Sequence, residues 1–213
     1  MKNAAEEFVS DLCTRSFLAL WSYPNPQGKS GKELCDFLVV CHPDVIVFSV
    51  KEIAFKDTGR PGVDLSRWQR EAVEESVKQV YGAERRLGVV DQVTTNAGGA
   101  GLSLPEKAVR RVHRVAVALG GENKVLLSSR DYGKGYVHVF DRPAFGTILQ
   151  ELDTISGFVA YLAAREGLRA RLRIEGGEED LLAVYLRNGR AFPANYNVIH
   201  VASGLWRGFF GCD

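Results

Sequence analysis

The chain has 213 residues, of which 46% are hydrophobic and 25% charged, a composition typical of globular proteins. This composition excludes disordered, collagen-like and low-complexity chains. Because 27 basic and 26 acidic residues leave a net charge of +1, no global field attracts the protein to nucleic acid or anionic lipid. A nucleic-acid site would therefore have to be a local patch.

Cysteine usage and the N-terminal sequence indicate the cellular compartment. The four cysteines form no C-x-x-C pair, and we expect reduced thiols at Cys13, Cys35, Cys41 and Cys212. The N-terminal segment is too acidic for a signal peptide, and no apolar run approaches the ~20 residues that span a bilayer. We expect a cytoplasmic protein that does not insert into membranes.

The first predicted elements are a helix and a β-hairpin. Apolar residues at helical spacing predict an amphipathic helix from about Ala4 to Trp21, which the following prolines end. Two short apolar runs, 34–41 and 45–51, flank the turn residues His42-Pro43-Asp44 and predict an antiparallel hairpin. Since both faces of each run are apolar, these strands are expected to be central and covered on both sides.

The rest of the chain alternates between helices and strands. Asp64 or Ser66 is expected to cap a helix that runs to about Leu87, and residues 89–105, with a glycine cluster at 96–101, are expected to form a surface loop. Strands are predicted at 112–119, 125–128 and 136–140, and helices at 143–151, 155–165 and 178–186. No repeat or linker divides the chain, so we interpret residues 1–213 as one domain of the α/β class, with a mixed central sheet flanked by helices.

Asp36 and Lys51 are charges within otherwise apolar strands, and burial of a charge needs a partner or a metal. A two-residue turn at His42-Pro43 places Asp36 opposite Ser49 with Lys51 diagonal to it, and a four-residue turn places Asp36 opposite Lys51. In both registers Asp36, Ser49 and Lys51 share one face of the hairpin. A three-residue turn would instead place Asp36 beside Val50. A buried Asp–Lys ion pair that fixes register is the alternative to a functional site.

The segment Gly31-Lys32-Glu33-Leu34-Cys35-Asp36-Phe37-Leu38-Val39-Val40, a turn, Val45 to Phe48, Ser49-Val50-Lys51 and a following helix resemble the core of PD-(D/E)XK nucleases. The resemblance implies a restriction-endonuclease-like core of the αβββαβ type over residues 4–90. Residues 106–213 would add the rest of the sheet and a C-terminal α+β extension.

The resemblance also implies a site. Asp36 matches the metal-binding Asp of the family and Lys51 its catalytic Lys, whereas Ser49 stands where the family usually has Glu or Asp. Some restriction endonucleases of this kind have Ser-x-Lys and supply the acid from the following helix. At about 100° per residue, the apolar side of that helix centres near Ser76, with Glu75 on its flank and Glu71 further round. Glu71 and Glu75 are the two candidates for that acid, and Glu33 is a further candidate metal ligand. The expected metal is Mg²⁺ or Mn²⁺, and the expected substrate is DNA.

Other side chains have weaker signals. Glu6 or Glu7 on the first helix could approach the site, and contacts to a phosphate are considered for Gln69, Lys78 and Gln79. Basic clusters that could hold phosphates are Arg85-Arg86; Lys107, Arg110, Arg111 and Arg114; and Arg165, Arg169, Arg171 and Arg173. His138, within an apolar strand, is expected to be a core residue.

These observations lead to two hypotheses. The first is a Mg²⁺-dependent endonuclease-like protein that hydrolyses phosphodiester bonds in DNA, in restriction, phage defence or repair. The second is a catalytically inactive module of the same fold that binds nucleic acid or a protein partner. A homodimer, or a partner that supplies DNA affinity, is also compatible with the sequence.

Overall fold

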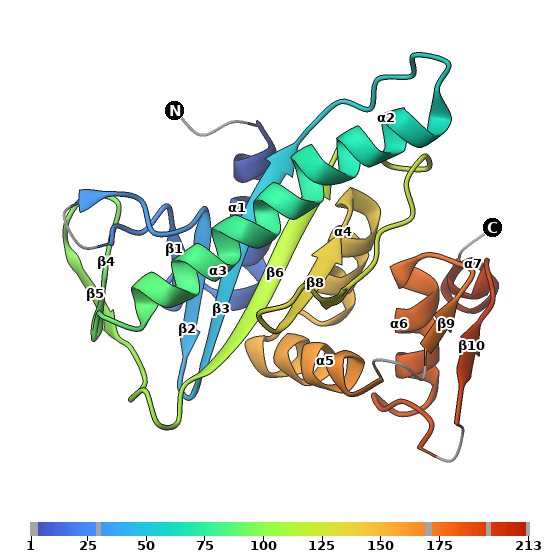
Figure 1. The fold of residues 1–213 in the computed structure, drawn as a ribbon. Coiled ribbons are helices and arrows are strands. Elements are labelled where there is room, and N and C mark those ends of the chain that lie inside the picture. The colour runs from blue at the N-terminus through green and yellow to red at the C-terminus, as the bar shows by residue number, and fades with distance from the viewer. Residues whose placement is uncertain (1–3, 29–30, 169–171, 195–196, 212–213) are drawn as a thin grey trace. The chain divides into compact units, whose positions relative to one another are not determined.

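The computed structural model describes residues 4–28, 31–168, 172–194 and 197–211 and shows an α/β protein with a mixed six-stranded sheet (Figure 1). β1 to β3 form an antiparallel meander, β6 and β8 continue parallel to β3, and β7 is antiparallel to β8. The mixed central sheet is therefore confirmed. In the order of pairing, the strands are β1 (Ser22–Pro24), β2 (Phe37–Cys41), β3 (Asp44–Glu52), β6 (Arg111–Leu119), β8 (Tyr136–Phe140) and β7 (Arg130–Asp131).

The β2–β3 hairpin has the two-residue turn. Cys41 pairs with Asp44 across His42-Pro43, and Phe37 pairs with Phe48 at the other end of β2. Every residue of β2 except Cys41 is buried, and β3 is buried from Asp44 to Val50. The expectation of central strands covered on both faces is confirmed.

Helices lie on both faces of this sheet. The N-terminal helix α1 (Ala4–Phe17) buries Val9, Cys13 and Phe17, and in Figure 1 it lies behind the strands. It ends before the predicted Trp21, because Leu18 adopts a left-handed backbone conformation with φ of 62°.

The opposite face is covered by one continuous helix made of α2 (Pro61–Trp68), a π-helical segment η2 (Gln69–Glu74) and α3 (Glu75–Leu87), which crosses in front of the strands in Figure 1. Its apolar side packs on two strand sets: Val80, Ala83 and Leu87 join Leu38 and Val47, whereas Trp68, Ala72 and Val77 join Ala116 and Ala118. The predicted apolar side of this helix is thereby confirmed.

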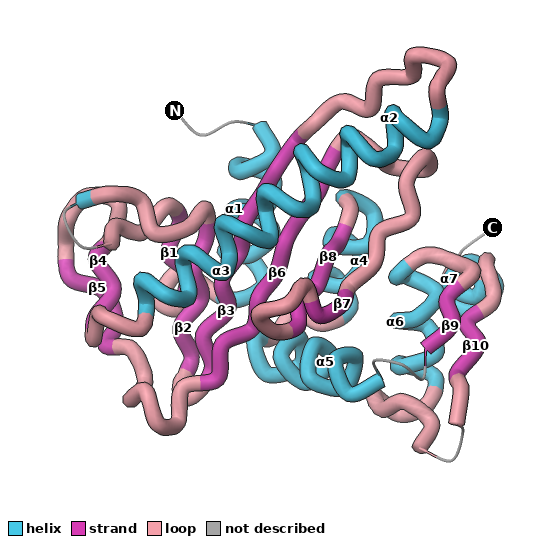
Figure 2. Tube along the Cα trace, in the orientation of Figure 1, coloured by secondary structure: helices cyan, strands magenta, loops and turns pink. Residues whose placement is uncertain are grey.

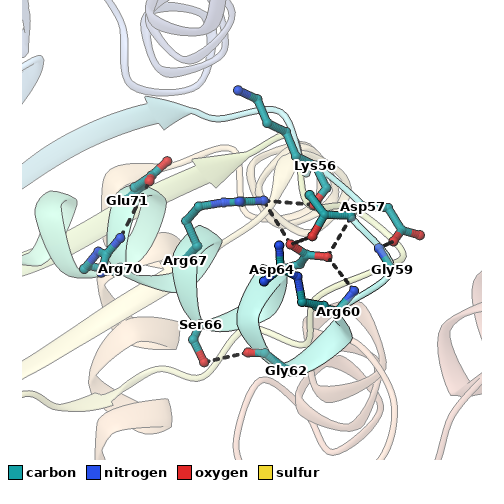
Figure 3. Close-up of polar contacts among 11 residues, drawn as sticks. Lys56, Asp57, Gly59, Arg60, Gly62, Asp64, Ser66, Arg67, Arg70 and Glu71 are labelled. Carbon is teal, nitrogen blue, oxygen red and sulfur yellow. Dashed lines mark hydrogen bonds and ion pairs between the residues drawn. The ribbon is translucent and has the colours of Figure 1, made fainter.

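The predicted cap of this helix is wrong. The helix begins at Pro61, which fits the first helical turn because proline lacks an N–H, and neither Asp64 nor Ser66 is its N-cap. Asp64 instead lies inside the helix and reaches back to the β3–α2 loop, which Figure 2 shows leaving β3 and turning into α2. Its carboxylate accepts hydrogen bonds from the backbone N–H and the hydroxyl of Thr58, at 2.8 and 2.7 Å, and from Arg67 (Figure 3).

Two further predictions of secondary structure are wrong. Residues 89–105, expected to be a loop, contain the hairpin β4 (Gln92–Thr94) and β5 (Ala100–Ser103), with the glycine cluster at its turn. These strands are too short to show an alternating pattern in the sequence. A residue far away in the chain helps to hold them, since Leu102 N–H donates to the Tyr23 hydroxyl at 2.9 Å. Residues 125–128 are not a strand, although Val125 and Leu127 pack in an apolar cluster.

The chain comprises two compact units, Met1–Arg142 and Pro143–Asp213. The boundary lies within helix α4, so no linker composition could mark it in the sequence. The three predicted C-terminal helices are confirmed, whereas β9, β10 and α7 are additional, and Arg169 and Arg171 lie outside the described residues. The elements here are α4 (Arg142–Glu151), α5 (Ile155–Leu168), β9 (Leu172–Ile174), α6 (Glu178–Arg187), β10 (Ile199–Val201), parallel to β9, and α7 (Leu205–Phe210).

Across the described segments, no helix combines the length and apolar character needed to cross a bilayer.

Candidate functional site

Asp36, Ser49 and Lys51 lie on the sheet face that the long helix covers. Side chains of a strand alternate between faces, and Leu38 of β2 and Val47 of β3 pack against α3. Asp36, two residues before Leu38, and Ser49, two residues after Val47, therefore face the same helix. Lys51 follows by the same alternation, and its neighbour on β6 is the small Ala118. The predicted shared face is observed.

Asp36 is held at the start of β2 by a contact with the neighbouring strand. Its Oδ2 accepts a hydrogen bond from Val50 N–H at 2.5 Å. Burial raises the pKa of Asp36 to about 6, against the lowering effect of this hydrogen bond, and the charges of Glu33 and Glu6 add to the rise. A hydrogen bond between the Asp36 and Glu33 side chains acts in the same direction. Glu33 and Glu6 thus both favour the protonated form of Asp36.

Ser49 is engaged by the helix. Its hydroxyl donates to Oε1 of Gln79 at 2.7 Å, and the residue is only 2% exposed. The position at which the PD-(D/E)XK pattern has an acid is thus occupied by a neutral hydroxyl bound to an amide. The pair joins β3 to α3 directly beside Asp36.

Lys51 is half-buried at the far end of β3, and no ion pair connects it to Asp36 in the described part of the chain. Its charge acts instead on α3. The pKa of Glu75 is lowered first by its hydrogen bond with Lys78 and by the charge of Lys78, and the ammonium of Lys51 contributes to the same lowering. The buried Asp–Lys pair considered as the structural alternative does not form.

The two helix acids expected to complete the site point to other partners. Glu71, in the π-helical segment, is exposed and lies 3.9 Å from the guanidinium of Arg70 (Figure 3). Glu75 bonds to Lys78 at 2.6 Å and is 49% exposed. Among the described residues, no group of three or more Asp, Glu, His or Cys side chains is arranged to hold a metal ion.

A cavity of about 430 Å³ lies over Asp36, between the start of β2 and the side of α3. Asp36 and Glu33 line this cavity together with cationic side chains of the helix, among them Lys78. Lys78 and Gln79 are two of the residues considered above for contacts to a phosphate. Arg86 also donates a hydrogen bond to the carbonyl of Leu34, which fixes one wall. The polar residues that line the cavity are Glu33, Asp36, Ser49, Lys78, Gln79, Arg85 and Arg86.

The second basic cluster of the sequence is largely committed to internal contacts. Arg110 donates to the carbonyls of Pro105 and Leu87, Arg111 pairs with Asp44, and Arg114 pairs with Glu84. These arginines stabilise the fold around the strand ends. Among the clusters, Arg85-Arg86 is the one that lines the cavity over Asp36.

Other candidate residues have structural positions. Arg165 is buried and bonds to Glu178, while Arg173 is exposed on β9. His138 is 2% exposed and lies between the rings of Tyr136 and Phe140, which supports its interpretation as a core residue. Cys13 and Cys35 are buried free thiols, Cys41 is a partly buried one, and Cys212 lies outside the described residues.

Sequence reasoning missed the residues that adjoin this cavity on α3 and in the β7–β8 turn. Tyr81, Gly82, Tyr132 and Lys134 line a second cavity next to the first. The spacing of Lys78, Gly82 and Arg85 on one helix side was a usable signal for part of this set. Tyr132 and Lys134 come from a turn that only the fold brings near α3.

In comparisons with known proteins, no protein-family model, no curated protein and no solved structure matched this chain.

Proposed function

We propose that the protein is a metal-dependent nuclease-like enzyme that hydrolyses phosphodiester bonds in DNA. The observation that carries the proposal is the position of two acids, Asp36 and Glu33, in one cavity that also contains Lys78, Arg85 and Arg86. Groups with strongly shifted pKa values in a cavity are candidates for function. A phosphodiester needs both cationic groups and a metal-binding acid, and this cavity offers both.

The order of elements supports the same proposal. A helix, α1, precedes the three-stranded meander β1–β3, and the long helix α2–η2–α3 then leads to β6, which lies parallel to β3. Apart from the inserted β4–β5 hairpin, this order is compatible with the αβββαβ core that the resemblance to PD-(D/E)XK nucleases implies. Asp36, one residue before β2, and Lys51, one residue before the end of β3, are the residues that the resemblance assigns to metal binding and catalysis.

The acid pair fits a divalent cation. Mg²⁺ is commonly held by one or two protein carboxylates and keeps several waters. The charge of Glu33 helps to raise the pKa of Asp36, a cost to the ionised form that a bound cation would remove because it stabilises the carboxylate. When bound, the metal would polarise a phosphate oxygen and acidify a water.

The remaining roles follow from charge and position. Lys78, Arg85 and Arg86 line the cavity and would bind phosphate oxygens of the substrate. Lys51, on the same face, would stabilise negative charge that develops at the phosphate. The Ser49–Gln79 hydrogen bond holds β3 and α3 at a fixed separation beside these groups.

A plasmid-cleavage assay tests the proposal. Purified protein with Mg²⁺ or Mn²⁺ is expected to nick or cut supercoiled DNA, and Asp36→Asn, Glu33→Gln and Lys51→Ala are each expected to reduce the rate by at least about 100-fold. Lys124→Ala, exposed and outside the cavity, is the matched control and is expected to retain full activity. Cleavage that survives both Asp36→Asn and Lys51→Ala would rule out this assignment.

A second candidate is a catalytically inactive module that binds nucleic acid or a protein partner. It is favoured by the ion pairs that engage Glu71 and Glu75 and by the neutral Ser49. Such a module would bind DNA with unchanged affinity when Mg²⁺ is removed and would leave plasmid intact with either metal. The cleavage assay, accompanied by a DNA-binding measurement, separates the two candidates.

A further inference from the structure

A second cavity of about 580 Å³ adjoins the one over Asp36. Both cavities are lined by Lys78, Gly82 and Arg85, so they meet on the same side of α3. The second cavity extends from this shared wall to Tyr81, Tyr132 and Lys134. An extended ligand in the first cavity would therefore continue over Lys78 and Arg85 toward the two tyrosines.

The two tyrosines are fixed in place before any ligand binds. The Tyr81 hydroxyl donates to the Gly135 carbonyl at 2.6 Å, and the Tyr132 hydroxyl donates to the Ser128 carbonyl at 2.8 Å. Both rings also pack on the edge of the cluster around Trp68 and Val77. Rigid aromatic rings lose little entropy on binding and suit the stacking of a nucleic-acid base.

Gly82 forms the wall between the cavities, and the fold itself does not require a glycine there. Its φ is not positive, and an added Cβ would meet only the end of the flexible Arg86 side chain at 3.8 Å. Glycine inside a helix is less favourable than alanine. The free space that the missing side chain leaves at the wall is consistent with a ligand that crosses there.

The charges along this path suit a phosphate backbone. Lys78, Arg85 and Lys134 are cationic, and the acidic Glu84 of the lining is paired with Arg114. Glu74 also lines the second cavity and Glu75 bonds to Lys78, so two carboxylates oppose the cations at one border. The cations at the shared wall therefore lie between the acid pair and the tyrosines.

We propose that the two cavities bind one single-stranded nucleic-acid segment, with a phosphate over Lys78 and Arg85 and the adjoining base against Tyr81 and Tyr132. The inference rests on the proposed function for the statement that this strand is the one cut near Asp36. A single strand is the fitting ligand, since in a duplex the base faces are stacked within the helix and cannot enter a recess lined by tyrosines.

Fluorescence anisotropy in EDTA, which prevents cleavage, tests this inference with labelled oligothymidylate of about 12 nucleotides. The single strand is expected to bind at least about tenfold more tightly than a duplex or than an abasic strand of equal length. An RNA strand that binds as tightly as the DNA strand would support the proposal, because it would show that the site contacts the base and the phosphate and not the sugar. A duplex or abasic strand that binds as tightly as oligothymidylate overturns the proposal.

Variants locate the bound strand. Gly82→Leu fills the shared wall, and Tyr132→Leu removes a ring, so each is expected to weaken binding by about tenfold, whereas Tyr132→Phe keeps the ring and the affinity. Gly62→Leu, in α2 where an added Cβ meets nothing, is the matched helix-glycine control. Circular dichroism spectra and thermal midpoints identify any variant that fails to fold, in which case Lys134→Ala replaces it.

The result separates this inference from the proposed function. If plasmid is cut in an Asp36-dependent manner while folded Gly82→Leu and Lys134→Ala bind oligothymidylate as the wild type does, the nuclease proposal stands and the single-strand path is wrong. If single-strand binding depends on Gly82 and Tyr132 but no cleavage occurs, the path stands and the nuclease proposal is wrong.

Discussion

The carboxylate of Asp36, one residue before β2, accepts a hydrogen bond from the backbone N–H of Val50 in β3 at 2.5 Å. This contact places an acid at the border between the buried hairpin and the cavity beneath α3. The hydrogen bond favours the ionised carboxylate, whereas burial and the neighbouring Glu33 and Glu6 favour the protonated form and outweigh it, which gives a pKa of about 6. The folded protein therefore retains an acid that costs it stability.

The first prediction concerns the pH dependence of unfolding. The pKa of Asp36 is about 6 in the folded chain and near its ordinary value of 3.8 when unfolded, so the folded state binds the proton more tightly. The contribution of Asp36 to the free energy of unfolding is therefore highest below about pH 4, falls as the pH rises toward 6, and stays low above pH 6. Asp36→Asn cannot ionise and is expected to raise the free energy of unfolding at about pH 8 by on the order of 2 kcal/mol.

Urea denaturation of wild type and Asp36→Asn at about pH 4 and pH 8 measures this difference. The two proteins should be close in stability at the lower pH and diverge at the higher one. Glu106→Gln, at an exposed position, is the control and should follow the wild type. A parallel pH dependence in wild type and Asp36→Asn would contradict the raised pKa.

The second prediction concerns metal binding by the acid pair. A cation competes with the proton that Asp36 binds, so the affinity for Mn²⁺ should increase about tenfold per pH unit below about 6 and level off above it. Isothermal titration calorimetry in buffers of different ionisation enthalpy reads both the affinity and the protons released. Asp36→Asn should remove most of the proton release, and Mn²⁺ binding that is independent of pH would show that the cation binds elsewhere.

The third prediction concerns the contact between β3 and α3. The Ser49 hydroxyl, buried to 2% exposure, donates to Gln79, and each partner left alone would lose a buried hydrogen bond. Ser49→Ala and Gln79→Ala are each expected to cost about 1 kcal/mol, and the double variant less than the sum, with a coupling of about 1 kcal/mol. A double-mutant cycle in urea gives the coupling, and additive effects would show that the bond contributes nothing.

The hairpin and its register were predictable because they depend on local information. Alternation in two apolar runs and the turn residues His42-Pro43 restrict the pairing to a few registers, and all but one of these place Asp36, Ser49 and Lys51 on one face. The apolar side of the following helix was predictable for the same reason. The start of this helix at Pro61 was not predictable. An Asp before a helical run is typical of an N-cap, whereas Asp64 lies within the helix and binds Thr58 of the preceding loop.

The partners of the site residues could not be read from the sequence. Helical periodicity placed Glu75 at the border of the helix, but it could not show that Lys78 pairs with it. The π-helical segment Gln69–Glu74 also departs from the uniform rotation per residue assumed for Glu71. Tyr132 comes close to α3 only through the β7–β8 turn, a contact for which local patterns have no signal.

The fourth prediction concerns the C-terminal unit. Arg165, with a side chain only 3% exposed, bonds to Glu178, which also accepts from the Tyr161 hydroxyl at 2.7 Å. Glu178→Ala leaves a buried guanidinium without this acid and is expected to cost about 3 kcal/mol. Glu175→Ala is the control, because its pair with His200 is exposed and should contribute less than about 1 kcal/mol. Similar thermal midpoints for the two variants would contradict this account of the buried pair.

The fifth prediction separates the effect of Gly82 on the stability of α3 from the proposed role of Gly82 at the shared wall. Gly82 lies inside α3 without a positive φ, and a Cβ there meets nothing closer than the end of Arg86 at 3.8 Å. Gly82→Ala is therefore expected to stabilise the protein by about 0.5–1 kcal/mol, because alanine is the better helix former.

At Gly120, in contrast, φ is 89° and a Cβ would collide with the carbonyl of Ile53, so Gly120→Ala is expected to destabilise the protein by more than that. Thermal midpoints of the two variants should move in opposite directions. If Gly82→Ala lowers the midpoint, the glycine has a packing role in the fold, and its link to ligand binding loses its main support.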